Sequence, residues 1–210
     1  MAANEKSTRS IFSDVRDTLG GLFGGKLDAN AALTAVRIAV LTISDTRDEE
    51  SDTSGHVLVE RLTGAGHQLA NKAIVRDDIG EIRAQVKAWT GAGEVDVILT
   101  TGGTGLTGRD VTPEALEPLF EKRMDGFATL FLIVSHAKIG TSAIQTRATA
   151  GVAGATYIFC LPGSPGACRD AWDEILVHQL DYRYRPCNFV EIMPRLDEHL
   201  RRAKAKGATV

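Results

Sequence analysis

The chain has 210 residues, a hydrophobic fraction of 43%, a charged fraction of 24% and a formal net charge of −3, which is typical of one soluble globular domain. This charge balance argues against a nucleic-acid-binding protein, because such proteins usually present a strongly basic face. No apolar run approaches the length needed to cross a bilayer, and Asp14, Arg16 and Asp17 interrupt the N-terminal segment where a signal peptide would be apolar. We therefore expect a cytoplasmic enzyme or binding protein that engages neither nucleic acid nor membrane.

The cysteines and histidines show no metal-binding pattern. Cys160, Cys168 and Cys187 lack C-x-x-C spacing, which predicts reduced thiols and neither a disulfide framework nor a zinc site. The five histidines show neither H-x-x-x-H nor H-E-x-x-H spacing, so we interpret them as structural.

Residues 1–34 differ from the rest of the chain and are predicted to form an N-terminal extension. Apolar residues between Ile11 and Phe23 recur at helical spacing, but two glycine pairs weaken this segment as a helix. We expect the extension to be partly disordered or to pack on a neighbouring subunit. A membrane-surface helix is a weaker alternative because the segment has a poor basic face. The compact domain is predicted to span residues 35–210.

The compact domain opens with an alternation of strands and helices. Apolar runs at residues 36–43, 67–75 and 95–101 predict three buried strands, and residues 55–63, capped by Ser54, and 79–89 predict the helices between them. This order is typical of an α/β fold with a largely parallel sheet, whose ligands bind beyond the carboxyl ends of the strands. Three loops are therefore expected to converge there: residues 44–46, residues 76–78 and the glycine-rich loop that follows residue 101, with Asp110.

The glycine-rich loop predicts a phosphate-binding site. Gly102, Gly103, Gly105 and Gly108 allow sharp turns and close approach of a ligand, and Thr112 and Pro113 are typical of a helix N-cap and first helical residue. The loop fails the dinucleotide fingerprint because its helix begins too late. It also fails the P-loop motif, because Arg109-Asp110 stands in place of Lys-Ser/Thr. A plain glycine turn without a ligand is the alternative.

A second glycine loop follows later in the chain. Helices are expected at residues 113–123 and 127–138, then a run of small residues at 148–154 and a buried strand at 156–161. That strand leads into the loop at 162–166 and a helix over 167–180, and a terminal helix is expected at 196–206. Two such loops at one sheet edge predict a ligand that carries more than one phosphate.

Two aspartates and two arginines are the chemical candidates near these loops. Asp77 and Asp110 end adjacent predicted strands, and a pair of carboxylates beside phosphate-binding backbone is what a Mg²⁺–nucleotide site needs. Capping or surface roles are the alternative for each aspartate. Arg109 and Arg147 could neutralise phosphate charge, and exposed ion pairs are their alternative.

These motifs resemble the MoaB/Mog family of molybdenum cofactor biosynthesis proteins. The resemblance rests on the segments 101–105, 109–115 and 161–165, and it covers residues 36–196. The segments 52–56, 139–142, 145–147 and 185–189 resemble the MoaB branch in particular. Residues 1–34 lie outside the resemblance.

The resemblance implies a fold, a reaction and a site. The fold is a three-layer α/β/α molybdopterin-binding domain with a mixed, largely parallel sheet, assembled as trimers or hexamers. The reaction is Mg-ATP-dependent adenylylation of molybdopterin, with Asp77 and Asp110 as catalytic residues and tentative Mg²⁺ ligands. A non-catalytic molybdopterin-binding or carrier protein is the alternative, and other molybdenum cofactor enzymes are potential partners. The residues expected to bind nucleotide and molybdopterin are Ser44, Asp45, Gly102, Gly103, Thr104, Gly105, Ser142, Arg147, Pro162, Gly163, Ser164 and Pro165.

Overall fold

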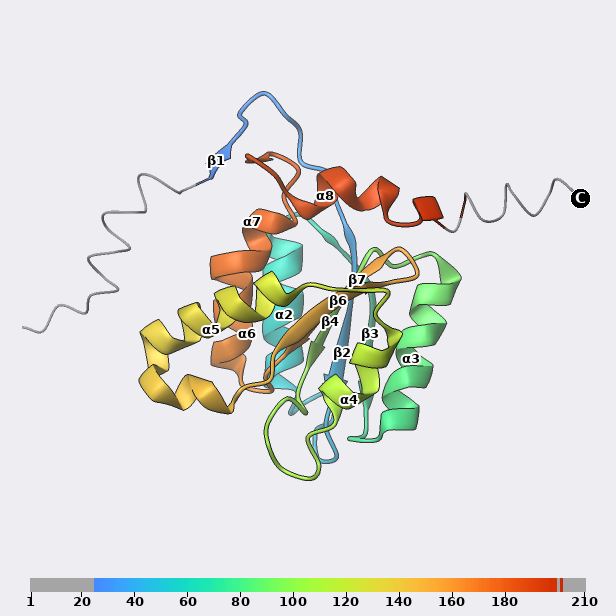
Figure 1. Ribbon diagram of the computed structural model, residues 1–210, viewed down its shortest axis with the longest axis vertical. Coiled ribbons are helices and arrows are strands. Elements are labelled where there is room, and N and C mark those ends of the chain that lie inside the picture. The colour runs from blue at the N-terminus through green and yellow to red at the C-terminus, as the bar shows by residue number, and fades with distance from the viewer. Residues whose placement is uncertain (1–24, 200, 202–210) are drawn as a thin grey trace, which may run out of the picture.

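The computed structural model describes residues 25–199 and residue 201, and it contains a six-stranded mixed sheet between two layers of helices (Figure 1). The strands are arranged in the order β3-β2-β4-β7-β6-β5. Four strands are parallel: β2 (Arg37–Ile43), β3 (Gln68–Val75), β4 (Val97–Thr101) and β7 (Thr156–Leu161). Two complete the sheet in antiparallel fashion: β6 (Thr149–Ala153) and β5 (Lys122–Arg123).

The sheet is buried on both faces, which confirms the expected three layers. Successive residues of a strand point to opposite faces, so Ile38 and Val40 join one apolar core while Ala39 and Leu41 join the other. The first core is covered by helices α2 (Thr53–Gly64), α5 (Asp125–Ile139) and α6 (Pro165–Ala171). The second is covered by helices α3 (Ile79–Ala92) and α4 (Thr112–Leu116).

Helix α2 begins earlier than the sequence indicated, because Asp52 and not Ser54 caps it. Asp52 is fully buried, and its Oδ1 accepts a hydrogen bond from the Gly55 N–H at 2.9 Å. Its Oδ2 accepts from Thr42 Oγ1 at 2.9 Å and lies 3.2 Å from Lys72 Nζ. A cap that is also tied to β2 and β3 is favoured over a serine with only local partners.

The segment after the glycine loop is less helical than predicted. Helix α4 ends at Leu116 and is followed by a 3₁₀ turn, η1 (Glu117–Leu119), and by β5, where a helix to residue 123 was expected. Thr112 does not cap the helix. Its Oγ1 instead donates to the carbonyl of Gly102 at 2.8 Å, so the start of α4 is fixed to the loop that precedes it.

The small residues at 148–154 form β6, an element that the sequence did not reveal. They pair with β7 through a turn in which Gly154 and Ala155 have φ of 56° and 69°. Their size has a packing reason, since a Cβ at Gly151 would lie 2.3 Å from the ring of Phe120. A larger side chain at Gly151 would therefore not fit, and the glycine interrupts the apolar pattern of a typical strand.

The N-terminal end of the described chain packs on a segment near residue 185. Strand β1 (Lys26–Leu27) pairs with β8 (Tyr184–Arg185), so the last part of the N-terminal extension lies on its own chain. The apolar positions from Ile11 to Phe23 fall outside the described residues, so the expected behaviour of that segment stays a prediction. The chain then forms helix α8 (Phe189–Ile192). Most of the helix predicted at 196–206 is outside the described residues.

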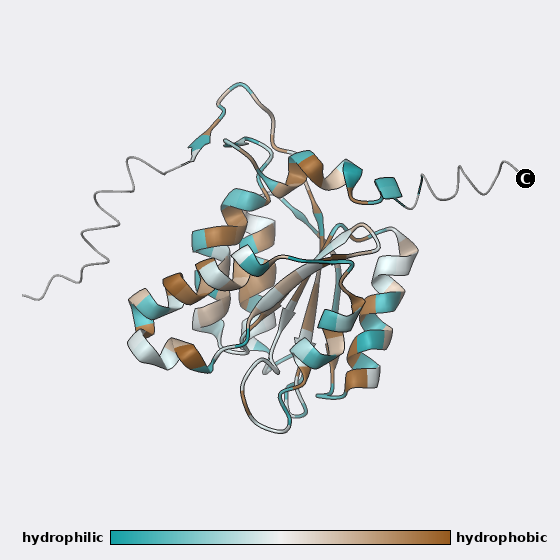
Figure 2. Cartoon of the chain, in the orientation of Figure 1, coloured by the Kyte–Doolittle hydropathy of each residue, from teal (hydrophilic) through white to brown (hydrophobic). Residues whose placement is uncertain are grey.

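Helix α5 departs from the sequence analysis in another respect. Together with the following 3₁₀ helix η2 (Gly140–Gln145) it is long and apolar enough, by length and composition alone, to cross a membrane, although no such run was expected. However, Phe127 and Phe131 of α5 are buried in the core, and Lys138 pairs with Asp170 of α6 at 2.6 Å. These contacts are typical of a helix of a globular domain, and its outer side carries exposed apolar residues (Figure 2).

Candidate functional site

The loops after β2 and β3 meet at the carboxyl edge of the sheet, as predicted. The N–H of Asp45 donates to Oδ2 of Asp77 at 3.0 Å, and the N–H of Asp77 donates to Oδ1 of Asp45 at 3.2 Å. The N–H of Ser44 also donates to the carbonyl of Val75 at 2.9 Å. These backbone contacts hold the two loops side by side.

The glycine loop closes on the same place because two of its residues lack a Cβ. Gly102 and Gly103 have φ of 106° and 63°, a conformation that other residues rarely adopt. A Cβ at Gly102 would lie 2.2 Å from the carbonyl oxygen of Ile43. A Cβ at Gly103 would lie 2.3 Å from Thr112 Oγ1 and 3.2 Å from Asp77 Oδ1. Glycine at both positions therefore brings the loop against β2 and Asp77.

Asp77 and Asp110 do not end adjacent strands, contrary to the prediction, because β2 lies between β3 and β4. The two carboxylates nevertheless face the same loop. Asp77 lies beside Gly103, and Asp110 lies beside Gly105, where a Cβ would be 2.8 Å from its Oδ2. The glycine loop extends across the end of β2, and this brings Asp110 to the same loop as Asp77 although β2 separates their strands.

The surroundings of the two aspartates shift their pKa values in opposite directions. Burial, followed by the nearby charge of Asp45, raises the pKa of Asp77. Hydrogen bonds from Thr107 lower the pKa of Asp110: the Thr107 hydroxyl and N–H donate to its Oδ2 at 2.6 and 2.8 Å. Asp110 is thus held in its charged form, while the charge of Asp77 is destabilised.

The second glycine loop lies directly against the first. The N–H of Gly102 donates to the carbonyl of Leu161 at 3.1 Å, and Thr101 Oγ1 donates to the carbonyl of Pro162 at 3.0 Å. A Cβ at Gly163 would lie 3.2 Å from the Cα of Gly102. Helix α6 then starts at Pro165, with the hydroxyl of Ser164 accepting from the N–H of Ala167 at 3.3 Å. The predicted pairing of two glycine loops is therefore present.

A cavity of about 410 Å³ opens between these loops and helix α5. It brings together eight predicted site residues, namely Gly103, Thr104, Gly105, Asp110, Ser142, Pro162, Gly163 and Ser164. Ser44, Asp45, Asp77, Gly102 and Pro165 lie in the surrounding loops and are not part of its lining. The sequence analysis missed Phe131, Ser135 and Ile139, which also line the cavity. Their spacing of four residues, which places them on one face of α5, is the signal that could have identified them.

The two candidate arginines occupy different places. Arg109 is well exposed and its guanidinium pairs with Asp45, which links the glycine loop to the loop after β2. Arg147 does not line the cavity. Its Nε and Nη2 donate to the carbonyls of Gly105 and Asp110, both at 2.8 Å, and its Nη1 pairs with Glu114.

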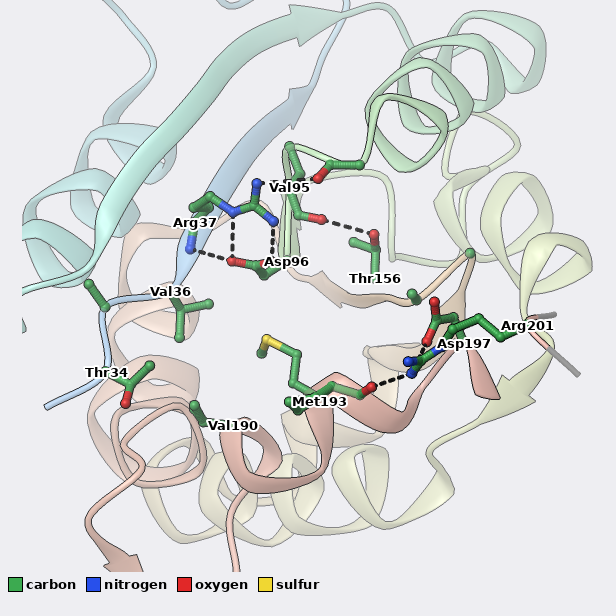
Figure 3. Close-up of a pocket in the computed structure, with 15 residues that line it drawn as sticks. Thr34, Val36, Arg37, Val95, Asp96, Thr156, Val190, Met193, Asp197 and Arg201 are labelled. Carbon is green, nitrogen blue, oxygen red and sulfur yellow. Dashed lines mark hydrogen bonds and ion pairs between the residues drawn. The ribbon is translucent and has the colours of Figure 1, made fainter. Parts of the chain in front are cut away.

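A second cavity, of about 430 Å³, lies at the other edge of the sheet, below the N-terminal ends of β2 and β7 (Figure 3). Its charged lining residues bind one another. Arg37 makes a bidentate contact with Asp96, with distances of 2.6 and 3.0 Å, and Arg201 pairs with Asp197 at 2.6 Å (Figure 3). The charged residues of this lining are therefore engaged with the protein, and the glycine loops lie at the opposite edge.

Fold and site together define an α/β/α domain with two glycine loops and two aspartates at its carboxyl edge. Residues 39–182 match the family model described as "Probable molybdopterin binding domain". The chain therefore belongs to the MoaB/Mog family of molybdenum cofactor biosynthesis proteins, as its motifs predicted.

Individual relatives support this assignment. The chain is 54% identical over 153 residues to the Escherichia coli K12 protein named Molybdenum cofactor biosynthesis protein B, covering 73% of this chain and 90% of that protein. It is also similar to a crystal structure of Molybdenum cofactor biosynthesis protein B, with a TM-score of 0.72 and 41% identity over 80% of this chain and 99% of that one. The Mog protein of Mycobacterium ulcerans gives a TM-score of 0.63 at 29% identity, covering 70% of this chain and 97% of that one.

Proposed function

We propose that this protein adenylylates molybdopterin with Mg-ATP in the cytoplasm. An oxygen of the terminal phosphate of molybdopterin attacks the α-phosphorus of ATP, and the bond from that phosphorus to the bridging oxygen of the β-phosphate breaks. The products are adenylylated molybdopterin and pyrophosphate. The observation that carries the proposal is that Asp77 and Asp110 face one glycine loop from two sides, at Gly103 and Gly105, beside the cavity of about 410 Å³.

The residues of the site fit a magnesium ion. Its carboxylates are hard oxygen ligands, and Mg²⁺ is typically bound by one or two carboxylates together with phosphate oxygens and water. The described residues include no group of three or more His, Cys, Asp and Glu side chains that would form an all-protein metal site, which is consistent with an ion that arrives with its nucleotide. Asp77 and Asp110 would hold it. When bound, Mg²⁺ would neutralise charge on the triphosphate and on the leaving pyrophosphate.

The chain itself supplies orientation. In the proposal, backbone N–H groups of Gly103 and Thr104 bind phosphate oxygens, and molybdopterin occupies the part of the cavity lined by Ser142 and by the second glycine loop. Arg109 is exposed beside Asp45 and would meet the triphosphate at the rim. Such a site accelerates the transfer by holding the attacking oxygen and the α-phosphorus close together.

The proposal is tested by incubating the protein with ATP, MgCl₂ and molybdopterin and measuring pyrophosphate and adenylylated molybdopterin. We expect both products in equal amounts, and Asp110→Asn should lose turnover while keeping its circular dichroism spectrum. Asp125→Asn, an exposed aspartate at the start of α5, is the matched control and should stay active. Binding of molybdopterin without either product would contradict the enzyme and support the non-catalytic carrier.

We also propose that the protein forms a homo-oligomer, either a trimer or a hexamer. Support comes from the outer side of α5 and η2, where large apolar side chains are exposed in the single chain. Exposed apolar surface of this kind is typical of a protein–protein interface. The residues concerned are Leu130, Leu132, Ile133 and Ile144.

A further inference from the structure

Arg147 is bound to the glycine loop through its backbone N–H and two of its guanidinium nitrogens. Its Nε and Nη2 donate to the carbonyls of Gly105 and Asp110, both at 2.8 Å, and its own backbone N–H donates to the carbonyl of Thr104 at 3.0 Å. Its Nη1 pairs with Glu114 of helix α4. The guanidinium therefore joins the two ends of the segment from Gly105 to Asp110.

These contacts determine which way the loop faces. In a trans peptide group the carbonyl and the following N–H point in opposite directions. Because the carbonyls of Thr104 and Gly105 point toward Arg147, the N–H groups of Gly105 and Leu106 point away from it. The backbone of Gly105 interacts there with the carboxylate of Asp110, whose Oδ2 would lie 2.8 Å from a Cβ at Gly105.

The cavities on the two sides of the loop agree with this orientation. Asp110 lines the cavity between the two glycine loops, whereas Arg147 lines a separate one beside Glu114 and Arg123. The sequence predicted that Arg147 binds phosphate, but its donors are occupied by the loop and it does not reach the lining of the site.

We infer that Arg147 is a positioning residue, which holds the glycine loop so that the Asp110 carboxylate faces the substrate cavity. As far as the reaction is concerned, this inference rests on the proposed function. Two carbonyls are held by one planar guanidinium. A lysine keeps the charge but has no planar fork, so it cannot reproduce this contact.

The substitution Arg147→Lys separates positioning from phosphate binding. A positioning role predicts that kcat falls by roughly 10–100-fold, the scale of a small misplacement of a catalytic group. The KM for ATP should then change by no more than about threefold, since uniform binding energy is kept. If Arg147 bound phosphate directly, Arg147→Lys would instead raise the KM for ATP more than it lowered kcat. Because lysine keeps the positive charge, part of the binding would be retained. Arg123→Lys, an exposed arginine that pairs with Glu117 and Asp125, is the matched control.

A double-mutant cycle tests whether Arg147 acts through Asp110. If it does, Arg147→Lys should cause little further loss of kcat in an Asp110→Asn background, because the group that it positions is already removed. Independent, multiplicative losses would overturn the inference, as would wild-type kcat in Arg147→Lys alone.

Amide hydrogen exchange tests the inference about Arg147 without any measurement of the proposed reaction. Exchange of the amides in residues 103–111, including the Thr107 N–H that donates to Asp110, should be faster in Arg147→Lys than in the wild type and in Arg123→Lys. If the wild type shows no adenylylation, the proposed function fails while this comparison still decides the inference. Unchanged exchange in the segment would show that Arg147 does not hold the loop.

Discussion

Asp45 and Asp77 exchange backbone-to-carboxylate hydrogen bonds, Asp45 N–H to Asp77 Oδ2 at 3.0 Å and Asp77 N–H to Asp45 Oδ1 at 3.2 Å. Each donor is a main-chain group, so the position of both side chains is set by the path of the two loops. Two carboxylates are thereby kept close to each other, and the proximity of Asp45 contributes to the raised pKa of Asp77. A cation that bound there would relieve this repulsion.

The charge of Asp77 should destabilise the folded protein. A carboxyl group whose pKa is raised on folding favours the native state most below its unfolded pKa, and this contribution is lost as the pH rises through the folded pKa. Asp77→Asn should therefore increase the free energy of unfolding at pH 7, by up to about 1 kcal/mol for a partly exposed group. Urea denaturation of the wild type and of Asp77→Asn at pH 7 and at pH 3 measures this difference in the free energy of unfolding. The difference should vanish at pH 3. A loss of stability at pH 7 would contradict the prediction.

The charge of Asp110 should have the opposite effect. Its pKa is lowered, first by the hydrogen bonds from Thr107, so its contribution to stability is present above the unfolded pKa and disappears as the pH falls through the folded pKa. Asp110→Asn should cost about 1 kcal/mol at pH 7, the scale of a charge-assisted hydrogen bond that is partly exposed. Relative to the wild type at pH 7, the urea midpoint should fall in Asp110→Asn and rise in Asp77→Asn. Shifts in the same direction would contradict the prediction.

Gly103 should not tolerate a side chain. Its φ is 63° and a Cβ would lie 2.3 Å from Thr112 Oγ1, so Gly103→Ala should lower the free energy of unfolding by about 1–3 kcal/mol and abolish most activity. Gly91→Ala, in helix α3 with no atom within 4 Å of the added Cβ, is the control and should be neutral or stabilising by about 1 kcal/mol. Thermal denaturation of both variants, with the adenylylation assay, distinguishes loop strain from a general effect of alanine.

The exposed face of α5 and η2 should control assembly. Ile144 is 81% exposed in the single chain, and a charge there should prevent burial of this surface. We expect Ile144→Glu to shift the molar mass from light scattering toward that of a monomer, with unchanged circular dichroism. Gln145→Glu, at the next position, serves as the control. An oligomer of wild-type mass in Ile144→Glu would show that this face is not the interface.

The N-terminal extension is tested separately. Removing residues 1–24 leaves β1 and its pairing with β8 in place, so the domain should keep its melting temperature. Light scattering on full-length and truncated protein then shows whether the extension packs on a neighbouring subunit. A lower molar mass of the truncated protein would support that packing, and an unchanged mass would contradict it.

The sequence by itself determined the features that depend on neighbours along the chain. The apolar runs of β2, β4 and β7 and the glycines that follow β4 are local signals, because burial and positive φ each restrict the residue at that position. These signals were enough to predict an α/β fold with a largely parallel sheet, two glycine loops at one sheet edge and the candidate aspartates, while the three-layer α/β/α arrangement was implied by the family resemblance.

The tertiary structure alone decided what depends on residues far apart in sequence. β6 is a strand because small residues fit against Phe120, and Asp52 caps α2 because it is also bound to Thr42 and Lys72. Arg147 lies 37 residues from Asp110, and nothing in its immediate sequence distinguishes a guanidinium that binds phosphate from one that binds carbonyls. The direction of its donors depends on how the glycine loop folds back, which is set by contacts across the whole sheet edge.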